Sequence, residues 1–199
     1  MPTFVISQLY ESIMSTLAKL SVVAAASTAA VVSFGIRNIA PTPLSSVQAT
    51  NLFARFLSTP DQHVDVYQTT MSKPVSVELA AKAFFQSPVF QAERVILRLA
   101  GAGSTTDAEI DAMAFKEGEH VATFRVLETK ENEVLFCWDE SDAVNGHSWL
   151  AVTDSGHTLL FGSTIRNRSA FIRWVTPLHL VYAQIVLASA RYQLERSAV

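Results

Sequence analysis

Hydrophobic and polar positions change period several times along the chain, which predicts a mixture of strands and helices. Residues 63–71 alternate apolar and polar side chains, as a half-buried strand does. Apolar residues then recur at helical spacing from Ser76, a residue type that caps helix N-termini, through Phe85. A second helical pattern follows Pro88 and ends near Gly101. We therefore expect one strand followed by two consecutive helices.

The chain after residue 119 has the pattern of four strands joined by short turns. The segments are 120–130, 134–141, 147–153 and 157–167. The turns between the later segments contain Asp, Asn, Gly and Ser, so an antiparallel meander is expected. On the second and third strands, alternate positions share one face each, namely Val134, Phe136 and Trp138, and His147, Trp149 and Ala151. These aromatic faces predict that one side of the sheet faces inward.

A wide apolar arc near the C-terminus predicts a long helix. Thr176 and Pro177 suit an N-cap and a first helical position, because proline lacks an N–H that is unsatisfied there anyway, so we expect the helix to begin at Pro177. The apolar arc requires a cover on most sides of this helix. The order of elements predicts the α+β class, with an antiparallel sheet curved around the last helix. Over residues 46–199 this order resembles the helix-grip fold of START-like proteins.

Three short motifs carry a narrower resemblance. HSWLAV from His147, a strand ending in Asn167, and PLH from Pro177 are similar to an uncharacterised START-like family, whose members occur alone or fused to NAD(P)-binding short-chain dehydrogenase-type domains. The positions that match the family pattern are His147, Asn167, Phe171, Pro177 and His179. Trp149 stands where the family has an acidic residue, and Leu180 replaces an arginine. The resemblance implies a helix-grip-like fold and no established activity.

The first 45 residues differ from the rest of the chain. Residues 20–36 contain no charge and lie between Lys19 and Arg37. They are just short of the roughly 18 to 20 apolar residues that a membrane span needs. They suit a membrane-anchoring helix, a targeting segment or an Ala-rich helix packed on the domain. We expect an apolar N-terminal segment and linker at 1–45 and a helix-grip-like domain at 46–199. The protein is then expected to be membrane-associated through the N-terminal helix, or soluble after removal of that helix.

Composition and motifs exclude several classes of partner, cofactor and site. A formal net charge of −3, with the charges scattered, gives no basic field for nucleic acid. The single cysteine, Cys137, excludes an internal disulfide, and its apolar strand predicts an inert buried thiol. The five histidines form no HExxH motif, so no metal site is predicted. No GxSxG motif marks a nucleophilic serine. Since no GxGxxG motif or P-loop occurs either, no cofactor is expected.

The remaining polar candidates lie near the ends of the predicted strands and at the start of the last helix. An apolar pocket with a few convergent polar groups is the usual form of a small-molecule site. His147 and His179 are the candidate catalytic residues, because an imidazole can move a proton near neutral pH. The candidate substrate-binding residues are Trp138, Asp139, Trp149, Arg166 and Tyr182, with Asp142 nearby.

Three classes of function fit this pattern. The first is a cofactor-independent cyclase or isomerase that holds a hydrophobic metabolite in an apolar cavity, for example for a pericyclic or proton-transfer cyclisation. The second is a hydrophobic ligand-binding or carrier protein without catalysis. The third is an interaction domain attached to a membrane through residues 20–36, with a cavity filled by side chains. The first two require an open cavity, whereas the third does not.

Overall fold

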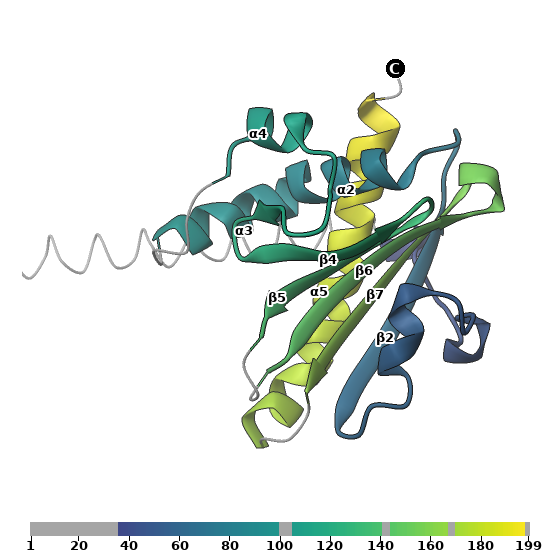
Figure 1. Ribbon diagram of the computed structural model, residues 1–199, viewed down its shortest axis with the longest axis vertical. Helices are drawn as coiled ribbons and strands as arrows, with labels where there is room; N and C mark the ends of the chain where they lie inside the picture. Colours follow the sequence, from purple (N-terminus) through teal and green to yellow (C-terminus); the bar gives the residue numbers. More distant parts are fainter. Residues whose placement is uncertain (1–35, 100–104, 141–143, 167–169, 198–199) are drawn as a thin grey trace, which may run out of the picture. The chain divides into compact units, whose positions relative to one another are not determined.

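The computed structural model describes residues 36–99, 105–140, 144–166 and 170–197. The chain divides into two compact units, Met1–Arg37 and Asn38–Val199. The second unit is an α+β fold, in which a curved antiparallel sheet is accompanied by a long C-terminal helix (Figure 1). The fold class expected from the sequence is therefore confirmed at this level.

Among the described residues, the sheet has seven strands in the order β1-β2-β7-β6-β5-β4-β3. The strands are β1 (Ala40–Pro41), β2 (Gln62–Thr70), β3 (His120–Val121), β4 (Phe124–Lys130), β5 (Glu133–Asp139), β6 (Gly146–Thr153) and β7 (Thr158–Arg166). The antiparallel meander is confirmed, because β4, β5, β6 and β7 pair in sequence order. β2 pairs with β7, so the first long strand lies beside the last, and Asp65 is opposite Ser163.

The helices are α2 (Val77–Gln86), α3 (Pro88–Leu99), α4 (Asp107–Ala112) and α5 (Ala170–Ser197). Ser76 is the predicted N-cap of α2, and its hydroxyl accepts the Leu79 N–H at 3.2 Å. The predicted start of the last helix was wrong, because α5 begins at Ala170 and contains Pro177. A proline removes one helical hydrogen bond, and the residues before it contain no glycine or second proline that would end the helix.

Both faces of the sheet are covered. The inner face packs against α2, α3 and α5, and α5 crosses behind β5, β6 and β7 in Figure 1. The outer face packs against the short 3₁₀ helix η3 (Leu52–Phe56). Phe53 of η3 stacks on Trp149, with ring centroids 5.2 Å apart and planes 7° apart. Phe53 also lies directly on Gly162, where an added Cβ would approach its ring to 2.7 Å.

The pairing of β5 with β6 changes the expected distribution of aromatic residues. Phe136 is opposite Ser148 and Leu135 is opposite Trp149. Trp149 therefore faces the outer side, whereas Phe136 belongs to the inner core. One side of the sheet does face inward, as expected, but the two aromatic faces point to opposite sides of the sheet and each has its own cover.

The N-terminal predictions concern a part of the chain that is mostly outside the described residues. Residues 20–35 of the predicted apolar segment lie there, so the anchor, targeting and docking interpretations stay predictions. In the described part of the chain, no helix is long and apolar enough to cross a membrane. The segment expected as a linker contains β1, which pairs with β2, and the 3₁₀ helix η2 (Leu44–Ser46).

Candidate functional site

A cavity of about 330 Å³ lies between the inner face of the sheet and helices α2, α3 and α5. Most of its wall is apolar, and the aromatic residues on it are Phe84, Phe90, Phe124, Trp138, Phe161 and Tyr182. The polar side chains on it are Glu93, Thr123, Ser148, Ser163 and His179, together with the Tyr182 hydroxyl. A partly open, mainly apolar space with a few polar groups has the composition of a small-molecule site.

The periodicity of each element brings its residues to this cavity. On α5, His179, Ala183 and Val186 are three or four residues apart and so lie on one face. On β7, Phe161 and Ser163 alternate with residues that face the outer side. The Trp138 ring lies against Gly146, where any added side chain would collide with it, so a glycine is needed to keep this wall in place.

A row of hydrogen bonds connects the cavity wall to a buried carboxyl group. Ser163 Oγ donates to Asp65 Oδ1 at 2.8 Å, and the same Oγ lies 2.8 Å from His179 Nε2. Ser163 and His179 line the cavity, whereas Asp65 lies behind them and is only 8% exposed. Burial raises the pKa of Asp65 to about 7, although the Ser163 hydrogen bond works in the opposite direction. This carboxyl can therefore gain or lose a proton near neutral pH.

The proton on Asp65 determines which nitrogen of His179 carries hydrogen. Burial lowers the pKa of His179, and the neighbouring His63 lowers it further, so the ring is neutral at pH 7. When Asp65 is ionised, Ser163 donates to it, and His179 Nε2–H donates to Ser163, which leaves a lone pair on Nδ1. When the proton of Asp65 is on Oδ1, both bonds can reverse, and the ring hydrogen then lies on Nδ1. His179 is thus an acceptor or a donor at Nδ1 according to the state of Asp65.

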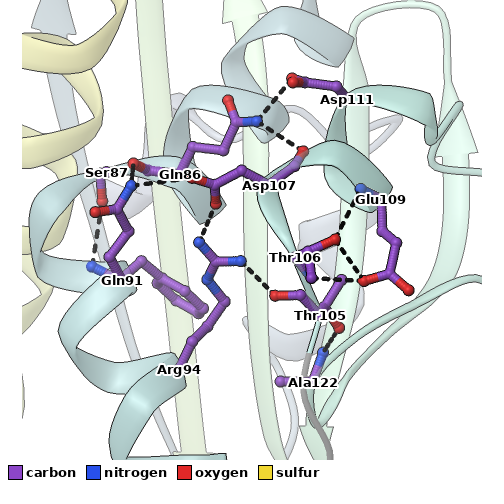
Figure 2. A network of polar contacts seen from close by, with 11 residues as sticks. Gln86, Ser87, Gln91, Arg94, Thr105, Thr106, Asp107, Glu109, Asp111 and Ala122 are labelled. Carbon is purple, nitrogen blue, oxygen red and sulfur yellow. Dashed lines mark hydrogen bonds and ion pairs between the residues drawn. The ribbon is translucent and has the colours of Figure 1, made fainter.

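A second polar pair connects α3 with α5 at the cavity. The Tyr182 hydroxyl donates a hydrogen bond to Glu93 Oε2. Burial raises the pKa of Glu93 and also that of Tyr182, whose phenol therefore stays protonated. Figure 2 shows how the next residue, Arg94, holds α3, since its guanidinium contacts the Thr105 carbonyl and the Asp107 carboxylate. Glu93 therefore stands on a helix that is fixed to the following segment.

The structure brings some of the predicted site residues together and separates others. Trp138, His179 and Tyr182 line the cavity. His147 and Trp149 lie on the outer face, where the His147 ring is 4.5 Å from that of Phe56. His147 and His179 are therefore on opposite sides of the sheet and cannot contact one bound molecule.

The other predicted residues lie at strand ends. Arg166 is the last residue of β7, and strand alternation puts it on the outer side with Gly162 and Thr164. Asp139 ends β5, and neither its side chain nor Asp142 is among the described parts. Neither aspartate is placed at the cavity by the described structure.

Three polar residues of the site were missed by sequence reasoning. Asp65 and Ser163 occupy positions in alternating strands that look solvent-facing, and Glu93 lies on an amphipathic helix. The available signal was the polar stripe His63, Asp65 and Tyr67 on one face of β2. That face points toward α5, so the stripe marked the interior and not the solvent side.

A larger hollow, of about 430 Å³, lies on the surface between η3 and β4. Its charged groups have partners within the protein, since Arg55 pairs with Glu128 and Lys130 Nζ donates to the Thr50 carbonyl at 2.6 Å. The cavity beside α5 is the better candidate because its wall is mainly apolar and buried acid–base groups converge on it.

Neither a search for metal-binding groups nor comparisons with known proteins assign a function to this site. Over the described ranges, no group of three His, Cys, Asp or Glu side chains is arranged to hold a metal ion. Comparisons with protein-family models, with curated proteins and with solved structures found no match to this chain. The function is therefore argued from the geometry of the cavity.

Proposed function

We propose that this protein is a cofactor-independent cyclase or isomerase that acts on a hydrophobic small molecule in the cavity by proton transfer at His179. The observation that carries the proposal is the row Asp65–Ser163–His179, which ends in an imidazole on the wall of a mainly apolar cavity. A neutral imidazole connected to a carboxyl with a pKa near 7 suits general acid–base catalysis at neutral pH.

The proposed reaction needs no partner molecule, since the substrate and the product have the same composition. The aromatic wall holds the substrate in a reactive orientation. His179 removes a proton from one atom of the substrate and returns it to another. The Ser163 hydroxyl connects the ring to Asp65, so that a change of tautomer at His179 is matched by a proton shift along the row.

We also propose that the second unit is a START-like helix-grip domain. Support comes from the chain order of β2, two helices, a meander and a long last helix, together with the pairing of β2 with β7. In such an arrangement the last helix and the sheet enclose the ligand, which agrees with the position of the cavity beside α5.

A carrier without catalysis is the second candidate. It is favoured by the pairing of the polar groups at the wall, since Ser163 contacts Asp65 and Tyr182 contacts Glu93. Groups that are satisfied in this way can simply reduce the cost of burial. The two candidates differ in one respect: only the enzyme needs His179 to accept a proton from the bound molecule.

The test uses a probe that reports a base in an apolar site. 5-Nitrobenzisoxazole is small and aromatic, and removal of its ring C–H proton breaks the N–O bond and releases a coloured phenolate. We expect the full-length protein to accelerate this elimination, and His179→Gln to lower kcat by roughly 100-fold with little change in KM. The rate should rise as pH increases through about 7, because ionised Asp65 leaves the lone pair on Nδ1.

His147→Gln is the matched control, since it makes the same change on the outer face of the sheet. It should leave the rate unchanged. If the wild type, His179→Gln and His147→Gln all show only the rate of buffer alone, the proposal of an enzyme would be refuted. Native mass spectrometry of full-length protein purified from its own cells would then decide for the carrier if an apolar ligand stays bound, and against both candidates if no ligand is found.

A further inference from the structure

Glu93 differs from the other residues of the cavity wall in carrying a carboxylate among aromatic rings. Phe90 is one turn before it on α3, and Trp138 and Tyr182 belong to the same wall. Among the described residues that line the cavity there is no lysine or arginine. The nearest arginine along the chain, Arg94, is engaged with Asp107 and the Thr105 carbonyl. The described wall therefore has an acidic group without a matching cation, and burial raises the pKa of that group.

We infer that the ligand of this cavity is a cationic amine with an apolar aromatic or alicyclic body, whose ammonium group binds at Glu93. The inference rests on the proposed function to the extent that the cavity binds a small molecule. It adds the chemical class of that molecule.

The chemistry of the wall favours this class in two ways. A carboxylate has about four acceptor sites, and the Tyr182 hydroxyl uses one of them, so an ammonium group can be bound as well. The faces of aromatic rings attract cations, and this attraction is stronger away from water. The same two features act against other ligands. An anionic head group would be repelled by the Glu93 carboxylate, and a neutral head group would not offset the burial that raises the pKa of Glu93.

Three ligands with the same apolar body separate these possibilities. 2-(2-Naphthyl)ethylamine, 2-(2-naphthyl)ethanol and 2-naphthylacetate differ mainly in the charge of the head group. Isothermal titration calorimetry at pH 7 should show the amine binding to the full-length protein about tenfold more tightly than the alcohol, and the acid binding most weakly.

Glu93→Gln tests the assignment to one residue. Glutamine can still accept the Tyr182 hydrogen bond, so the fold of this region should be kept. We expect the variant to bind the amine no more tightly than the alcohol, with the affinity for the alcohol unchanged. Glu78→Gln is the control, because it removes the same charge from the exposed surface of α2, where Glu78 pairs with Lys82. It should keep the preference for the amine.

The outcomes distinguish this inference from the proposed function. Equal affinities for the three ligands, or tighter binding of the alcohol or the acid, would overturn the inference while leaving a ligand-binding cavity. A preference for the amine that survives in Glu93→Gln would overturn the role of Glu93. Binding of none of the three would also overturn the inference, and the elimination assay and native mass spectrometry would decide separately whether the cavity acts on or holds another molecule.

Discussion

Asp65 is the residue in which the chemistry of the site and the stability of the fold are most closely connected. One carboxyl oxygen accepts from Ser163, whereas the other, Oδ2, is buried without a hydrogen-bond partner. His63 Nε2 is 3.8 Å from Oδ1, which is beyond hydrogen-bonding distance. A carboxylate in such surroundings is poorly compensated, and the physical result is the raised pKa.

The raised pKa predicts how stability changes with pH. The pKa of Asp65 rises from its ordinary value of 3.8 to about 7 in the folded protein, so between these pH values the folded state holds a proton that the unfolded state has lost. The contribution of Asp65 to folding is then largest below pH 4 and is lost as pH rises toward 7. Relative to Asp65→Asn, we expect the wild type to lose up to roughly 4 kcal/mol of unfolding free energy over this window.

Urea unfolding of the two proteins at a series of pH values measures this difference. Burial lowers the pKa of His63 and of His179, so their contribution is lost as pH falls below 6.5, which is the opposite direction. Both histidines are present in both proteins, and the comparison therefore isolates Asp65. Parallel stability curves for the wild type and the variant would contradict a raised pKa at this position.

Among single residues, the sequence identified some members of the site correctly but did not show which side of the sheet each residue faces. His179, Trp138 and Tyr182 were predicted to belong to the site, and they line the cavity. Asp65 was not predicted, because an aspartate in an alternating strand normally faces solvent. Here the polar face of β2 is covered by α5, and this tertiary contact is not encoded in the local pattern of the strand.

Among the elements, η3 is attached to the sheet in part through a buried carboxylate, in addition to its apolar packing and the Arg55–Glu128 pair. Glu133 Oε2 accepts the Leu52 N–H at 2.9 Å and the Trp149 indole N–H at 2.8 Å. Glu133 is only 6% exposed, so both bonds are shielded from water. The covering of the outer face thus combines apolar packing with two charge-assisted hydrogen bonds.

Removal of this carboxylate should loosen η3. Glu133→Ala leaves two buried donors without an acceptor, and we expect it to lower the unfolding free energy by about 2–4 kcal/mol, measured by urea denaturation. Glu131→Ala, two residues away in the exposed turn before β5, should change it by less than about 0.5 kcal/mol. If the two variants are equally stable, the attachment of η3 is due to packing alone.

The existence and type of the elements could be predicted more reliably than their ends. The alternation of β2 and the Ser76 cap of α2 have local causes in the sequence, and both predictions are confirmed. The start of α5 was predicted from the pair Thr176–Pro177, which is common at helix starts but is also compatible with a proline inside a long helix. The pair Ser87–Pro88 has the same character, and there the helix does begin at the proline.

For the domain as a whole, the arrangement of the site depends on strand register, which the sequence did not determine. His147 and His179 were each predicted as a candidate catalytic residue, because both lie near the predicted ends of the aromatic-lined sheet. Cys137 is opposite His147 in the register, and this pairing turns His147 toward the outer cover. Since both faces of β6 are apolar, their residue types do not indicate which face meets α5.

The cavity itself predicts different responses from two buried alanines of α5. Ala183 is 2% exposed and lines the cavity, whereas Ala190 is fully buried in the core and does not. Ala183→Met can extend into open space, so its unfolding free energy should stay within about 1 kcal/mol of the wild type. Ala190→Met has no such space and should lose about 1–3 kcal/mol by urea denaturation.

The same pair tests whether the cavity is open in solution. A methionine at position 183 should also abolish binding of 2-(2-naphthyl)ethylamine, because it occupies the volume that the ligand needs. If Ala183→Met is instead as destabilising as Ala190→Met, side chains already fill the space, as an interaction domain would allow. A stable Ala183→Met variant that no longer binds the amine would place the ligand between α5 and the sheet, which both the enzyme and the carrier require.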